Sequence, residues 1–154
     1  MLLHIPGVLD RAQVARFRAA LDGAVMALPP AGDVAPGYMR SDVSCTLFLS
    51  EPEAYDGGGL VVDDTYGEHE VKLPAGDLIV YPSSSLHRVA PVTRGERRAA
   101  VGWIQSHVRD PRRRGVLFTL DQARRSLHAR DGGSAEFLQL SQVHSQLLRM
   151  WAET

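Results

Sequence analysis

The feature that most constrains the fold is a block of six short β-rich segments between Val43 and Val108. The segments are rich in β-branched and aromatic residues, turn-forming clusters separate them, and no helical periodicity interrupts them. Strands spaced about ten residues apart without intervening helices favour a sandwich or a jelly roll. The segments are VSCTLFLS (43–50), GGLVVDD (58–64), GEHEVKLP (67–74), DLIVYP (77–82), LHRVAPV (86–92) and RRAAVGWIQSHV (97–108).

Helical periodicity is confined to the two ends of the chain. Residues 10–24 begin with Asp10, a potential N-cap, and end near Gly23, a helix-stop signal. The last part of the chain holds two stretches with apolar residues at helical spacing, separated by the sequence ARDGGS. We therefore expect a mainly β core with one N-terminal helix over residues 1–108, and a helical extension of two helices over residues 109–154.

The composition argues against several classes of protein. The 154 residues include 17 basic and 18 acidic side chains, so no excess of positive charge attracts nucleic acid or an anionic membrane. Cys45 is the single cysteine and cannot form an internal disulfide. The start, MLLHIPGVLD, lacks the basic flank of a signal peptide, and no run approaches the roughly 20 apolar residues that span a bilayer. We expect a cytoplasmic protein that binds neither nucleic acid nor membranes.

Two residues in the last two β-rich segments are candidates for a binding site. His87 opens a strand directly after a serine-rich turn, and Arg97 opens the next strand ten positions later. On a strand this arginine shares a face with Ala99, Val101 and Trp103, so its guanidinium projects over small and apolar side chains. A buried arginine requires an anionic partner, and no acidic residue of the segment lies on that face. The pattern favours a ligand carboxylate, which the planar guanidinium can bind through two hydrogen bonds.

The fold decides whether these two side chains can meet. In a simple hairpin closed by TRGE, Val92 would pair with Arg97, and the alternation of side chains would put His87 and Arg97 on opposite faces. In a jelly roll, consecutive strands can lie in opposite sheets with both side chains facing the interior. We predict that His87 and Arg97 face one cavity, which requires the jelly-roll arrangement.

The β-rich block also carries a long family resemblance. It contains the sequence MRSDVSCTLFLSEPEAYDGGGLVVDDTYGEHEVKLPAGDLIVYPSSSLHRVAPVTRGERR. With LHIPGVLDRAQVARFRAAL at one end and SQLLRMW at the other, this sequence resembles the bacterial PKHD-type hydroxylases, a branch of the prolyl-4-hydroxylase-like, iron(II)- and 2-oxoglutarate-dependent dioxygenases. The resemblance implies a double-stranded β-helix, which is a jelly-roll or cupin-like fold of eight core strands.

The resemblance implies a set of ligands and a reaction. In this family iron is held by a His-x-Asp motif and a distal histidine, and a basic residue ten positions after that histidine binds the far carboxylate of 2-oxoglutarate. His87 matches the distal histidine, and Arg97 matches the co-substrate arginine. The implied reaction couples oxidative decarboxylation of 2-oxoglutarate to hydroxylation of a C–H bond by O₂. Fe(II), 2-oxoglutarate and L-ascorbate are the expected cofactors.

The proximal half of the implied iron site is missing from the sequence. No His-x-Asp or His-x-Glu occurs between Met1 and Val43. In ALDGAV, residues 20–25, Asp22 stands at the carboxylate position with Ala20 in place of the histidine. Alternatively, a deletion has joined the end of the first helix to the loop that follows the metal motif. We favour the deletion, because only six core strands are recognisable, and retain Asp22 as a candidate second metal ligand beside His87.

An incomplete jelly roll has consequences for stability and activity. Without the first two core strands, segments 86–92 and 97–106 each have an unpaired edge, and apolar edges recruit other strands, so we expect self-association. We also expect little or no turnover, because the iron site lacks ligands. The alternative to a dioxygenase is a non-catalytic, cupin-like binding module or an inactive remnant.

Two further residues are interpreted as structural. Cys45 alternates with apolar Val43 and Leu47 and is expected in the core. His69 lies between Glu68 and Glu70 and is expected on the surface, facing outward.

Overall fold

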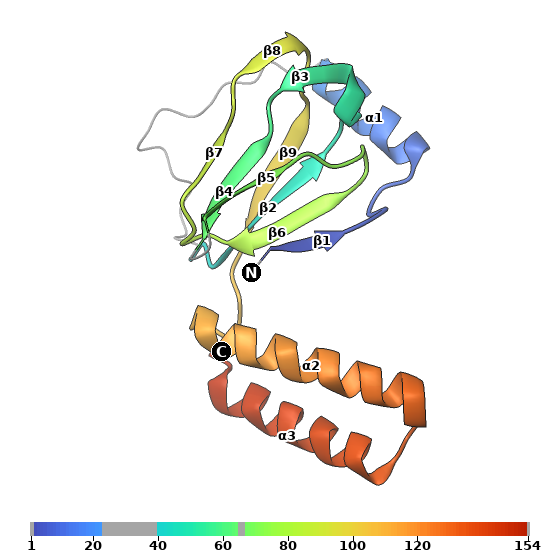
Figure 1. The fold of residues 1–154 in the computed structure, drawn as a ribbon, viewed down its shortest axis with the longest axis vertical. Helices are drawn as coiled ribbons and strands as arrows, with labels where there is room; N and C mark the ends of the chain where they lie inside the picture. Colours follow the sequence, from blue (N-terminus) through green and yellow to red (C-terminus); the bar gives the residue numbers. More distant parts are fainter. Residues whose placement is uncertain (1, 23–39, 65–66, 154) are drawn as a thin grey trace. The chain divides into compact units, whose positions relative to one another are not determined.

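A computed structural model describes residues 2–22, 40–64 and 67–153 (Figure 1). The chain divides into two compact units, residues 1–105 and 106–154, against a predicted boundary after residue 108. Of the described elements, the first unit contains the nine strands and one α-helix, and the second is a helical hairpin.

The first unit is built from antiparallel sheets, as expected for a jelly-roll-like fold. A four-stranded sheet has the order β1-β6-β2-β9, a three-stranded sheet has the order β5-β4-β7, and β3 pairs with β8 (Figure 1). The bounds are β1 Leu3–Ile5, β2 Val43–Phe48, β3 Tyr55–Gly57, β4 Leu60–Asp64, β5 Gly67–Val71, β6 Leu78–Pro82, β7 His87–Val89, β8 Val92–Gly95 and β9 Ala99–Ile104, with a 3-10 turn at Pro52–Ala54.

All six predicted strands are present, with shorter bounds than expected. The segment LHRVAPV ends its first strand at Val89, and β8 begins at Val92 on the other side of Pro91. Proline has no N–H for a ladder bond, which explains the break. The segment RRAAVGWIQSHV forms a strand only over Ala99–Ile104, so Arg97 precedes the strand instead of opening it.

The core of this unit lies between the two larger sheets. Its buried cluster combines Phe48, Ile79 and Tyr81 of the four-stranded sheet with Leu60 and Val62 of the three-stranded sheet. The two sheets therefore face each other across a shared apolar layer, as in a jelly roll.

One prediction about the core was wrong. Along β2 the residues that alternate with Cys45 are the buried ones, namely Ser44, Thr46 and Phe48, whereas Cys45 is only half-buried. The apolar positions suggested the opposite face, since polar residues seldom point inward unless they are hydrogen-bonded or line a site. Ser44 and Thr46 do line the cavity described below.

Helix α1, Arg11–Asp22, begins as predicted. The Asp10 carboxylate accepts a hydrogen bond from the backbone N–H of Gln13 at 2.8 Å, and the Gln13 side chain accepts one from the N–H of Asp10 at 2.9 Å, which is a reciprocal capping arrangement. Val14 is the buried residue of this helix, and Phe17 is 47% exposed. Beyond the first turn, Arg18 donates to the backbone oxygen of Leu49 at 3.3 Å and Asp22 pairs with Arg98.

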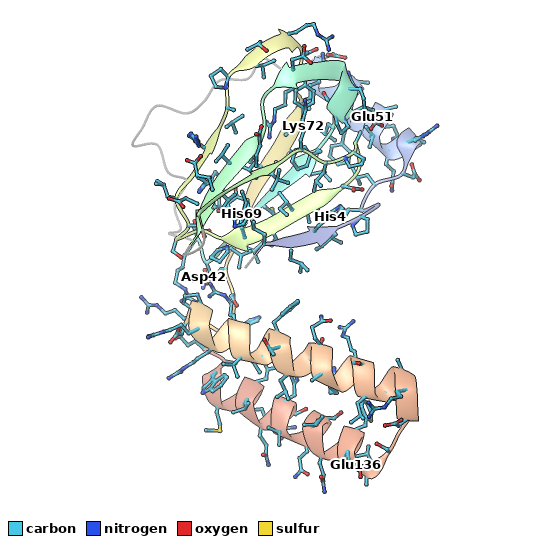
Figure 2. The ribbon with its side chains drawn as sticks, in the orientation of Figure 1. His4, Asp42, Glu51, His69, Lys72 and Glu136 are labelled. Carbon is cyan, nitrogen blue, oxygen red and sulfur yellow. The ribbon has the colours of Figure 1, made fainter. Side chains whose placement is uncertain are left out.

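Strand β1 is fixed to the sheet by a buried carboxylate. Asp77 accepts a hydrogen bond from the backbone N–H of Gly7 at 2.8 Å and contacts the His4 imidazole at 2.7 Å. Figure 2 labels His4 on β1. The hydrogen bond from Gly7 is the main cause of an Asp77 pKa below its usual value. Burial opposes this effect by raising the pKa, and His4 lowers it further.

We expect Asp77→Ala to destabilise the chain by about 1–3 kcal/mol at neutral pH, because two partners lose a charged acceptor. Since the Asp77 pKa is lower in the folded than in the unfolded chain, its contribution is present above the unfolded value, about pH 4, and is lost as the pH falls through the folded value. Urea unfolding at neutral and acidic pH should show the difference between the two proteins shrinking in acid. Asp63→Ala, at an exposed aspartate of β4, is the control; an equal loss there would contradict this account.

The second unit consists of α2, Pro111–Asp131, and α3, Ala135–Trp151, packed side by side (Figure 1). Asp110 caps α2 through the N–H of Arg112, and Ser134 caps α3 through the N–H of Phe137. The predicted break lies within ARDGGS: α2 ends at Asp131 and is capped by Gly132, whose φ of +64° favours glycine. Within the described ranges, no helix combines the length and apolarity needed to cross a membrane.

Candidate functional site

A small cavity lies between the two larger sheets. Its volume is about 200 Å³, and its walls come from β2, β4, β6, β7 and β9. The lining residues are Ser44, Cys45, Thr46, Leu60, Tyr81, His87, Arg88, Val89, Arg97, Val101, Gly102 and Trp103. This cavity is the one that brings His87 and Arg97 together, as the jelly-roll argument predicted.

The topology explains how two residues so near in sequence meet across a cavity. His87 opens β7 in the three-stranded sheet, where it is paired with Val62. Arg97 leads into β9 in the four-stranded sheet. The chain crosses from one sheet to the other through β8, so the two side chains approach the same space from opposite walls.

Arg97 presents buried donor atoms that the described residues leave unpaired. Its Nε and Nη2 atoms are shielded from solvent and have no hydrogen-bond partner there. The guanidinium carbon lies 5.6 Å from the centre of the Phe48 ring, over which the cation is held. Buried, unpaired guanidinium nitrogens are costly, so this side chain is poised for an anion.

Gly58 makes room for this arrangement. Its φ is +67°, and a Cβ atom there would lie 3.1 Å from Cδ of Arg97 and 3.0 Å from Cε2 of Tyr55. Tyr55 is 1% exposed, and its hydroxyl also has no partner within the described structure. Burial raises the pKa of Tyr55, and the adjacent Arg97 guanidinium opposes this rise. The phenol therefore stays protonated near neutral pH and can act as a donor.

His87 has a defined tautomer. Its Nδ1 lies 2.8 Å from the backbone oxygen of Ser85, which can only accept, so in the neutral ring Nδ1 carries the proton. The ring also makes an edge contact with Tyr81, with ring centres 5.0 Å apart. Nε2 is thus left with its lone pair, and a backbone carbonyl bonded to the other nitrogen is the arrangement that orients metal-binding histidines.

The structure does not bring Asp22 to His87. Asp22 lies at the end of α1, its side chain is 59% exposed, and it forms an ion pair with Arg98. Arg98 also binds Glu96, at 2.8 Å. Asp22 does not line the cavity. The Asp22 carboxylate therefore meets an arginine at the end of the helix, and the expectation that Asp22 serves as the second metal ligand finds no support in this geometry.

The other histidines of the first unit do not complete a metal site either. His4 is engaged by Asp77, outside the cavity. His69 is exposed, as predicted, although its pairing with Val62 places it on the same sheet face as His87. Among the described residues, no group of three or more histidine, cysteine, aspartate or glutamate side chains is arranged to hold a metal ion. The donor set present here does not fit iron.

The strands that carry the two candidate residues both lie at sheet edges. In the described part of the chain, β7 ends the order β5-β4-β7 and β9 ends the order β1-β6-β2-β9. On the cavity side of β9, Val101 is 66% exposed and Trp103 is 54% exposed. Among the described residues both edges are thus unpaired, as predicted, and that of β9 is apolar, whereas the self-association expected from them stays a prediction.

Comparison with known families gives two matches. Residues 26–105 match the 2OG-Fe(II) oxygenase superfamily, and residues 111–153 match the PKHD-type hydroxylase C-terminal domain. The first match covers the strands of the cavity, and the second covers the helical hairpin.

Individual relatives agree with these families. A PKHD-type hydroxylase of Xylella fastidiosa (strain M23) is 58% identical over 134 residues, which are 87% of this chain and 58% of that protein. The PKHD-type hydroxylase YbiX of Shigella dysenteriae serotype 1 (strain Sd197) is 56% identical over 133 residues, 86% of this chain and 57% of that protein. The chain thus spans less than two thirds of the length of these relatives. Among solved structures, a Pseudomonas putida prolyl-4-hydroxylase aligns over 44% of this chain and 38% of its own, with 37% identity and a TM-score of 0.39.

Proposed function

The chain belongs to the 2OG-Fe(II) oxygenase superfamily, in its PKHD-type hydroxylase branch, and we propose that its cavity binds 2-oxoglutarate through Arg97. The function proposed at the family level is that of an Fe(II)- and 2-oxoglutarate-dependent dioxygenase that hydroxylates its substrate with O₂. In this chain the co-substrate end of the site is retained, and the iron end is reduced to His87.

The observation that carries the proposal is the pair of buried, unpaired nitrogens of Arg97. A carboxylate satisfies both at once through parallel hydrogen bonds, and each such charged bond is about twice as strong as a neutral one. The cavity volume of about 200 Å³ is below the roughly 300–1,000 Å³ of typical ligand pockets. That size suits a short dicarboxylate better than a larger cofactor.

His87 supports the same orientation of the ligand. It lines the cavity on the wall opposite the four-stranded sheet, with Nε2 available as a ligand atom. A 2-oxoglutarate molecule with one carboxylate at Arg97 can direct its 2-oxo acid end toward His87. One histidine holds a metal ion weakly, because non-haem iron sites of this class use two histidines and a carboxylate.

We therefore expect 2-oxoglutarate to bind without appreciable turnover. Purified chain should give a saturable signal with 2-oxoglutarate in calorimetry or ligand-observed NMR. With Fe(II), 2-oxoglutarate, O₂ and L-ascorbate supplied, it should form little succinate and retain little iron after buffer exchange. Absence of 2-oxoglutarate binding would remove the proposed function. Tight, stoichiometric iron binding with succinate formation would show that the iron site is complete.

A further inference from the structure

The cavity that holds His87 and Arg97 is open on the side where the two larger sheets end. Three of its lining residues belong to the edge strands and are at least half exposed, namely Val89 on β7 and Val101 and Trp103 on β9. Side chains that point between two packed sheets are normally buried in the layer they share. Among the described residues, this side of the cavity therefore lacks a wall.

The free edge of β9 can supply this wall by pairing with another strand. The backbone oxygen of Arg98 accepts a hydrogen bond from the N–H of Leu49, and β2 bonds to every second residue of β9 from there on. The N–H and C=O groups of Ala99, Val101 and Trp103 therefore point away from β2, to the side where no described strand lies. Their side chains lie on the core face of the sheet, since the residues of β2 that they face are the buried ones. A strand added at this edge thus extends both the sheet and the cavity wall.

The sequence of β9, AAVGWI, fits a second copy of itself. It contains no charged residue that pairing would bury. In an antiparallel pair centred on Val101, the two Val101 residues face each other, and Ala99 of one copy faces Trp103 of the other, so a small side chain lies opposite a large one. This register pairs all three residues whose backbone groups point to the edge, and a shift in either direction leaves one of them opposite a residue outside the strand. The Arg98 side chains lie at opposite ends of the pair, so like charges do not meet.

We propose that a second copy of this chain completes the cavity: its β9 pairs antiparallel with β9, and its Trp103 covers the open side. Facing residues of an antiparallel pair lie on the same face of the sheet, so the partner's Trp103 stands beside Ala99 on the cavity side. Ala99 is two residues from Arg97 along that face, and a ligand at Arg97 is then enclosed by residues of both copies. The inference goes beyond the proposed function, because the pairing does not depend on which ligand binds.

Val101→Cys tests the register of the pair. Facing residues that exchange backbone hydrogen bonds have Cα atoms about 5.5 Å apart, within the roughly 4.4–6.8 Å that a disulfide spans. Under mild oxidation at micromolar concentration we expect this variant to form covalent dimers. Val116→Cys, at an exposed position of the helical unit, measures collisional cross-linking. The wild-type chain measures the reaction of Cys45, which lies on the opposite face of the sheet.

Both controls should cross-link far more slowly than Val101→Cys. Equal rates for Val101→Cys and Val116→Cys would overturn the proposal. It would also be overturned by faster cross-linking of Val89→Cys than of Val101→Cys, since Val89 belongs to β7 and the pairing would then use the other edge.

Fluorescence of Trp103 reports whether the partner covers it. Trp151→Phe leaves Trp103 as the single tryptophan and alters only the helical unit. On dilution from micromolar concentration, its emission should move to longer wavelength and its quenching by acrylamide should increase, over the range in which sedimentation shows the dimer dissociating. A dimer in which Trp103 stays as exposed as in the monomer contradicts the covering role, and a chain that is monomeric throughout contradicts the pairing. The proposed function fails separately, if the chain binds no 2-oxoglutarate, because neither measurement uses that ligand.

Discussion

Arg97→Ala is expected to weaken 2-oxoglutarate binding by about 2–5 kcal/mol, or roughly 30-fold to several thousand-fold. The variant removes both buried nitrogens that we assign to the ligand carboxylate, and it leaves that carboxylate in a cavity without its counter-charge. The loss should lie at the upper end of this range if the carboxylate stays desolvated, and at the lower end if water enters the space left by the side chain. Calorimetry on the two proteins measures the difference directly.

Two companion variants make this measurement specific. Arg94→Ala is the matched control, because Arg94 is an exposed arginine on β8 that pairs with Asp56 outside the cavity. It should bind 2-oxoglutarate as wild type does. Arg97→Lys keeps the charge without the planar fork and should give an intermediate loss. Equal affinity in wild type and Arg97→Ala would rule out Arg97 as the clamp.

The general architecture was predictable from the sequence, and so was the position of His87 and Arg97 on one cavity. Period-two patterning and turn clusters define strands locally. Because side chains alternate along a strand, His87 and Arg97 can face the same interior in a jelly roll but not in a simple hairpin. Both residues line one cavity because β7 and β9 belong to different sheets. This conclusion needs only strand geometry and the requirement that an inward-facing arginine have a partner.

Several features of the site were not predictable, each for a physical reason. Tyr55 is brought to Arg97 by the pairing of β3 with β8, a short contact with no signal in the hydrophobic pattern. The inward face of β2 was misassigned because a cavity admits Ser44 and Thr46 where a packed core would exclude them. The ion pair of Asp22 was not foreseen, because a short motif does not reveal that an arginine distant in sequence, Arg98, reaches its carboxylate. The first and last of these depend on tertiary pairing, which local patterns do not encode.

The open side of β9 leads to the other large expected effect. The backbone N–H of Leu49 donates to the oxygen of Arg98. In an antiparallel pair every second residue is hydrogen-bonded to the partner strand. With the register of β2 and β9, Ala100 and Gly102 are therefore the residues that bond to β2. The backbone groups of the residues between them point to the unpaired edge. These residues are Ala99, Val101 and Trp103, and the last two also carry exposed apolar surface on the cavity side.

We expect the chain to self-associate through this edge and to be marginally stable as a monomer. An apolar edge strand with free backbone donors and acceptors is a template for pairing with the same strand of another copy. Sedimentation velocity or light scattering at micromolar concentration should therefore detect dimers or larger species. The edge of β7 offers a second template for strand pairing, which is shorter because β7 spans only His87–Val89.

Val101→Lys is expected to convert these species to monomers. A charge pointing inward from an edge strand is a recognised barrier to strand pairing, because pairing would bury it, and Val101 is exposed enough to accept a lysine without disturbing the core. Val116→Lys adds the same charge at an exposed position of α2, which belongs to the helical unit and not to the sheet, and should leave the association unchanged. If the wild-type chain is instead monomeric and unfolds cooperatively at high temperature, the edge is already protected and the account of missing strands fails. If both lysine variants dissociate the assembly equally, net charge and not the β9 edge controls association.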